Sequence, residues 1–151
     1  MKLTTTPVAK AALLIRKPIA EVYEAFVDPE IVTNFWFDKS TGRLESGKSV
    51  QWHWTMFDMI VDVKVLDAKE NEHIEIEWGT SAEDTSTAEW TFEQRSPDTT
   101  FITIVNRDFP GDIDKVVNSA LDCTGGFALV LAAAKAWLEH GVRLNVVADG
   151  H

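Results

Sequence analysis

The chain has 151 residues, of which 45% are hydrophobic, and its 24 acidic and 14 basic residues give a formal net charge of −10. This length and apolar content suit one domain over 1–151, with a core over about 8–141. The negative charge excludes functions that depend on attraction to phosphate groups, so we expect neither nucleic acid nor an anionic membrane as a partner.

Cys123 is the single cysteine of the chain, so no internal disulfide can form. A lone thiol is typical of a protein from a reducing compartment. The first residues contain no apolar stretch of signal-peptide length, and no window reaches the roughly 18 uncharged apolar residues of a membrane span. We therefore expect a cytoplasmic protein without a membrane span.

The predicted elements begin with a strand over 8–16, which is rich in Ala, Val, Leu and Ile. Pro18 then opens a helix, whose apolar residues recur at helical spacing until Asp28, the residue before a proline. A second short helix over 30–35 ends beside Trp36. Two short helices are thus expected after the first strand.

From residue 42 onward, apolar and polar residues alternate with period two, which is typical of half-buried strands. Further strands are predicted over 43–45, 50–54, 61–65, 74–78, 88–93 and 99–107. Together with the first strand this makes about seven. Because no long helix separates the later strands, we expect antiparallel hairpins and not parallel crossovers.

A long C-terminal helix is predicted over 114–140, capped by Asp112 or Asp114. At about 1.5 Å per residue it would be about 40 Å long, so it must lie along the sheet. Gly125 and Gly126 inside it should each cost about 1 kcal/mol relative to Ala. Close approach of another backbone, room for a ligand, or a tolerated kink would each account for this pair.

Four tryptophans occupy strand positions of matching parity, so they should point from one face of the sheet. They are Trp52, Trp54, Trp78 and Trp90. The long helix that must cover this face carries small residues at Cys123 and at its glycine pair. Large rings on one wall and small residues on the other predict a cavity between them.

The segment IRKPIAEVYEAFVDPE over 15–30, followed by Phe35-Trp36, resembles the opening of the START/Bet v 1-like (SRPBCC) superfamily. The strand pair 90–93 and 99–103 and the ending over 126–141 fit the same superfamily. The branch most similar is that of the C-terminal domain of the activator of Hsp90 ATPase. No single motif is specific, but their order and spacing over about 8–141 are.

The resemblance implies an α+β helix-grip fold. In that fold a curved antiparallel sheet of about seven strands surrounds a long C-terminal helix, and two short helices follow the first strand. It also implies a cavity for apolar molecules between sheet and helix. The turn over 57–59 lacks an expected glycine and the loop over 68–72 lacks an expected proline, so the shape of the cavity mouth should differ from the usual one.

The residues offer little for catalysis or metal binding. His53 and His73 have the polar parity of their strands, while His140 and His151 lie at the helix end and at the chain end, so no pair has metal-ligand spacing. Cys123 has no basic neighbour on its face to lower its pKa, which favours a packing thiol. We expect no catalytic residue, no metal and no cofactor.

The predicted function is therefore the binding of an apolar or aromatic small molecule between sheet and C-terminal helix. The candidate ligand-binding residues are Trp36, Trp54, Trp78, Trp90, Phe92, Cys123 and Phe127. Two alternatives stay open: an enzyme of polyketide cyclase or aromatase type, and a chaperone-binding or other protein-binding module. The identity of the ligand and the oligomeric state are not predicted.

Overall fold

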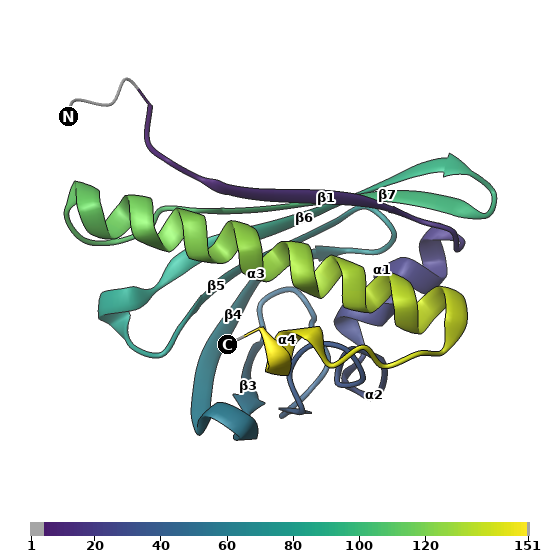
Figure 1. Ribbon diagram of the computed structural model, residues 1–151, viewed down its shortest axis with the longest axis horizontal. Helices are drawn as coiled ribbons and strands as arrows, with labels where there is room; N and C mark the ends of the chain where they lie inside the picture. The colour runs from purple at the N-terminus through teal and green to yellow at the C-terminus, as the bar shows by residue number, and fades with distance from the viewer. Residues whose placement is uncertain (1–4, 151) are drawn as a thin grey trace.

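The computed structural model describes residues 5–150 and contains a seven-stranded antiparallel sheet in the order β1-β7-β6-β5-β4-β3-β2 (Figure 1). The strands are β1 Ala9–Ile15, β2 Lys39–Ser40, β3 Ser49–Trp54, β4 Met59–Lys69, β5 His73–Gly79, β6 Ser86–Ser96 and β7 Thr99–Arg107. The helices are α1 Ile19–Val27, α2 Pro29–Val32, α3 Ile113–His140 and α4 Val146–Asp149, with 3-10 turns η1 Thr55–Phe57 and η2 Ala82–Asp84. The predicted α+β helix-grip fold is confirmed.

Two parts of the chain differ from their prediction. The expected strand over 43–45 is wrong, because the backbone N–H of Leu44 donates to the carbonyl of Val27 at 3.2 Å and not to a strand. The seventh strand is instead the short β2, which pairs with β3. The tail after Gly141, for which no element was predicted, contains α4.

The long helix α3 is continuous over its 28 residues, or about 42 Å at the usual rise. The Asp112 side chain accepts a hydrogen bond from the Lys115 backbone N–H at 2.9 Å and so caps its start. Gly141, with a φ of 65°, ends it in the left-handed conformation that glycine adopts without strain. The helix lies across one face of the sheet, with its main contacts to β1 and further contacts to β7 (Figure 1).

By length and composition, α3 would suffice to cross a membrane, since an 18-residue window within it has a mean hydropathy of 1.5. The expectation that no window reaches such a composition was therefore too strict. Its apolar side chains, such as Phe127 and Leu131, are buried between the helix and the sheet. The hydropathy of α3 is accordingly that of a core helix.

The inner face of the sheet is covered by different elements at its different strands. Helix α1 places Phe26 at ring-centroid distances of 6.3 Å from Trp90 and 6.2 Å from Phe92. Beyond α2, Phe37 stacks on Trp52 of β3 at 4.4 Å. Near β3, aromatic rings and not α3 therefore cover the inner face of the sheet.

The outer face of the sheet is polar and holds a charged cluster centred on His73. Its Nδ1 lies 2.7 Å from Asp67 Oδ2, and its Nε2 contacts Glu89. Arg107 donates to Glu89 Oε1 at 3.0 Å and also to Glu75. Burial by itself lowers the pKa of His73, but the hydrogen bonds to Asp67 and Glu89 outweigh it and raise the pKa above its usual value.

The charged form of His73 should stabilise the fold. Because its pKa is higher in the folded state than in the unfolded one, its contribution is fully present below about pH 6.5 and is lost as the pH rises through the folded pKa. We predict that the free energy of unfolding, measured by urea titration, falls between pH 6 and pH 9. The decline should shrink in His73→Gln and persist in His53→Gln, a matched change on β3. An equal decline in His73→Gln and wild type would contradict this account.

Candidate functional site

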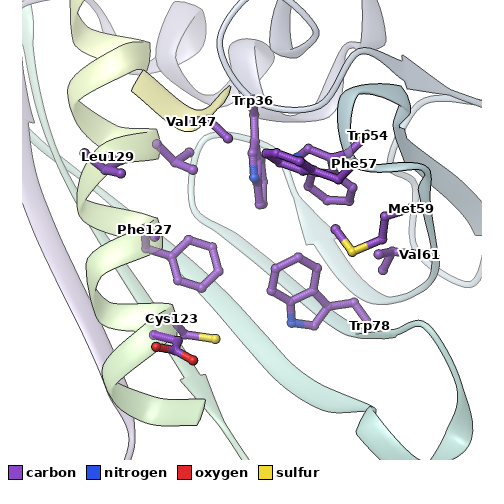
Figure 2. Close-up of a pocket in the computed structure, with 13 residues that line it drawn as sticks. Trp36, Trp54, Phe57, Met59, Val61, Trp78, Cys123, Phe127, Leu129 and Val147 are labelled. Carbon is purple, nitrogen blue, oxygen red and sulfur yellow. The ribbon is translucent and has the colours of Figure 1, made fainter. Parts of the chain in front are cut away.

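An apolar cavity of about 420 Å³ lies between β3, β4 and β5 of the sheet, the middle of α3, and α4 (Figure 2). Its lining residues come from six elements and one connecting segment of the chain. They are Trp36, Trp54, Phe57, Met59, Val61, Trp78, Asp122, Cys123, Gly126, Phe127, Leu129, Val130 and Val147. The volume is within the range of small-molecule sites, and the lining is predominantly aromatic and aliphatic, as in such sites.

Three aromatic rings meet at the centre of the lining. The ring centroids of Trp36, Trp78 and Phe127 are 5.9 Å, 5.8 Å and 5.7 Å apart in the three pairs. Trp36 lies in the segment after α2, Trp78 on β5 and Phe127 on α3. Their contacts therefore fix the relative positions of these three parts of the chain. Figure 2 shows these three rings around a common space, with Trp54 and Phe57 beyond Trp36.

Trp78 is held in place by a buried amide. Asn106 of β7 is fully buried, and its side-chain oxygen accepts the indole N–H of Trp78 at 3.3 Å. Its side-chain nitrogen donates to Ser86 Oγ at 2.9 Å and to the Thr87 carbonyl at 2.7 Å. With three partners the amide is well satisfied inside the core, and it orients one wall of the cavity.

Asn106 was not predicted as a site residue, although its position on β7 indicates that its side chain is buried. It has the inward parity of Ile102 and Ile104 on β7, and a polar residue at such a position needs buried partners. Parity alone identifies the position but gives no indication that the partner is Trp78, 28 residues away.

The remaining wall of the cavity comes from segments that were not predicted to contribute. Phe57 belongs to η1 and Met59 opens β4, in the turn where loop shape was uncertain from sequence. Val147 lies on α4, which packs against α3 and places this side chain over the cavity (Figure 2). Short elements such as α4 depend on tertiary contacts, so local sequence gives little sign of them.

Of the seven candidate binding residues, the structure brings five together at the cavity. These are Trp36, Trp54, Trp78, Cys123 and Phe127. Trp90 and Phe92 do not line it. Trp90 is 1% exposed beneath Trp36 and Phe127, and Phe92 packs edge-on against Tyr23 at 5.3 Å.

Trp90 carries an unusual polar atom for a core residue. Among residues 5–150, its indole N–H is the buried side-chain group that has no hydrogen-bond partner. Leaving such a donor unpaired costs on the order of 1 kcal/mol or more. The position is therefore maintained by the packing of the ring and not by its polar atom.

The glycine pair of α3 provides space on the helix surface. A Cβ atom built at Gly125 or at Gly126 would meet nothing within 4 Å, so neither glycine serves the close approach of another backbone. Gly126 lines the cavity, whereas Gly125 is exposed outside it. A larger side chain at Gly126 would enter the cavity, which is one physical reason for glycine there.

The polar chemistry of the cavity is limited. Burial, assisted by the negative charge of Asp122, raises the pKa of the Cys123 thiol to about 11. At neutral pH the thiol is therefore protonated and a poor nucleophile. Among the described residues, no group of three or more His, Cys, Asp and Glu side chains is arranged to hold a metal ion.

Comparison with solved structures identifies similar folds. A protein from Staphylococcus saprophyticus, SSP2350, is 28% identical with a TM-score of 0.77, over 91% of this chain and 95% of that one. The Aha1 dimer from Colwellia psychrerythraea is 17% identical with a TM-score of 0.75, over 89% of this chain and 97% of that one. DynU16, from the dynemicin biosynthetic locus, is 17% identical with a TM-score of 0.78, over 92% of this chain and 49% of that one.

A sequence search of curated proteins gave no match. A family model, by contrast, matches most of the chain, over residues 16–139. This region begins just after β1 and ends one residue before the end of α3, so it includes nearly all of the helix-grip fold. The chain belongs to the family described as activator of Hsp90 ATPase homolog 1-like protein.

Proposed function

We propose that this protein binds an apolar or aromatic small molecule in the cavity between β3–β5, α3 and α4. The observation that supports it most directly is an apolar space of about 420 Å³ beside five aromatic side chains, Trp36, Trp54, Phe57, Trp78 and Phe127. Rings of this kind offer large contact area at little cost in conformational entropy. The lone thiol is compatible with a cytoplasmic site of action.

Two alternatives involve the same fold. A cyclase-type enzyme would position a flexible substrate, and the similarity to a protein of a biosynthetic locus favours it. Such chemistry needs polar groups that converge on the substrate, and the side chains of the lining offer only Asp122, Cys123 and indole N–H groups. Binding without catalysis requires none of these.

A protein-binding module is the other alternative, and the similarity to the Aha1 dimer favours it. Phe57, which lines the cavity, and its neighbour Met56 are exposed apolar side chains, at 38% and 47%. An exposed apolar patch is what a partner would contact. This function would use the rim of the cavity and would not need its interior.

Filling the cavity should abolish binding. Gly126→Leu projects a side chain into the cavity, and Gly125→Leu makes the same change on the exposed side of the helix. Leucine is favoured over glycine in helices by roughly 0.8 kcal/mol, so both variants should fold. We predict that the affinity for neutral N-phenyl-1-naphthylamine, measured by energy transfer from tryptophan, falls about tenfold or more in Gly126→Leu.

In Gly125→Leu the same affinity should stay within about twofold of wild type. Equal affinities of the two variants would show that the probe binds elsewhere. A lack of saturable binding by the wild-type protein would overturn the proposal. Native mass spectrometry of freshly purified protein would show whether a small molecule accompanies it.

The thiol in the cavity should react slowly. With a pKa of about 11, Cys123 is ionised to roughly one part in a thousand at pH 8, whereas an unfolded cysteine is ionised to about a quarter. We predict that iodoacetamide alkylates the native protein at pH 8 on the order of 100-fold more slowly than the urea-unfolded protein. Similar rates in the two states would contradict the raised pKa of Cys123, and a faster rate in the native protein would show that the thiol is activated and would favour an enzyme.

A further inference from the structure

The lining of the cavity is asymmetric in charge. Among the residues that the structure describes, Asp122 is the one acidic side chain of the lining, and no Lys, Arg or His lines it. Arg143 lines an adjoining pocket of about 100 Å³ that shares Trp36 and Val147 with the cavity, and there it donates to Asn34 Oδ1 at 2.6 Å. The negative charge of the exposed Asp122 contributes, after burial, to the raised pKa of the adjacent Cys123 thiol. The chain as a whole adds a net charge of −10.

The aromatic rings add to this asymmetry. The face of an aromatic ring carries partial negative charge, and tryptophan attracts cations most strongly. Trp36, Trp78 and Phe127 meet pairwise within 5.9 Å, so a group in van der Waals contact with one of them is close to the others. A cation that lies over the face of one of these rings, within about 6 Å of its centroid, would be attracted to that ring.

An anionic ligand finds no such support. A carboxylate in this cavity would lose its hydration and would need cationic or N–H donors in return. The indole N–H of Trp78 is already donated to Asn106 and the Cys123 thiol is a weak donor, which leaves the neutral indole N–H groups of Trp36 and Trp54 and no cationic donor in the described lining. The charge of Asp122 and the ring faces would both repel it.

We infer that the ligand is a hydrophobic amine: an aromatic or polycyclic body with one quaternary or protonated ammonium group. The inference rests on the proposed binding function and specifies its ligand class. The ammonium group lies at the end of the cavity that Cys123, Phe127 and Trp78 line (Figure 2). Asp122, which precedes Cys123 in the sequence, lines the same cavity. The apolar body extends from there toward Trp54, Phe57 and Met59.

The test compares a cationic and a neutral probe of nearly equal shape with a smaller anionic probe that has the same naphthyl body. Trimethyl(2-naphthylmethyl)ammonium carries a cationic nitrogen where 2-neopentylnaphthalene carries a neutral carbon. The anionic probe is 2-naphthylacetate. Their dissociation constants are measured by quenching of tryptophan fluorescence. We expect the cation to bind about fivefold or more tightly than the neutral probe, and the anion to bind weakest.

Two variants locate the effect. Asp122→Asn should weaken binding of the cation about fivefold and leave the neutral probe within about twofold. Asp114→Asn removes the same charge from the exposed first turn of α3, outside the lining, and should change neither affinity.

The outcomes separate the two proposals. If the neutral probe or the anion binds wild type as tightly as the cation, the ammonium ligand is wrong and the apolar binding function stands. If Asp122→Asn and Asp114→Asn weaken the cation equally, the attraction is that of the net charge and the site is wrong. If no probe binds wild type, the binding function itself fails.

Discussion

The sheet of this protein is wider than the helix that covers it. Seven strands at about 4.8 Å spacing extend over about 29 Å, whereas an α-helix with its side chains is about 10 Å wide. Since the main contacts of α3 to the sheet are with β1, the backbone of the helix does not lie close against the inner face of β3 to β5. The apolar side chains on that face must still be removed from water, and this requirement organises the rest of the fold.

Aromatic side chains cover most of this apolar face. Trp36 and Phe37, in the segment after α2, pack on Trp52 with ring centroids at 4.9 Å and 4.4 Å. Helix α4, which packs against α3, covers another part of this face. Large rigid rings cannot fill an irregular space completely, because each has only two side-chain torsions with which to adapt. The unfilled remainder is the cavity, which is thus a consequence of how the sheet is covered.

The polar groups on the two faces of the sheet have different roles. On the inner face, Asn106 is fully buried with all its hydrogen bonds directed to Trp78 and β6, so a cavity wall is fixed without exposing charge to the core. On the outer face, His73 and Arg107 join carboxylates of three strands into one cluster. Within residues 5–150, Asp122 is the one carboxylate of the cavity lining; it is solvent-exposed and gives the lining its charge. Membership of the Hsp90-activator-like family is compatible with ligand binding and with protein binding alike, because one fold supports many functions.

Periodicity in the sequence determined the fold class. The period-two runs locate β3 to β7 to within a few residues, and the helical stripe with Asp112 and Gly141 gives both ends of α3, because these patterns reflect burial on one face of a regular element. The parity of the tryptophans likewise placed Trp52, Trp54 and Trp90 on the inner face, where each is almost fully buried.

Tertiary structure alone decided which inward residues meet the cavity. Trp78 and Trp90 share a parity, yet one lines the cavity and the other lies under Trp36 and Phe127, because depth depends on what packs above each ring. Phe57 and Val147 reach the site through a short turn and a four-residue helix that only long-range contacts stabilise. Local pattern encodes the face on which a side chain lies, and the distant segment that covers it is encoded elsewhere in the chain.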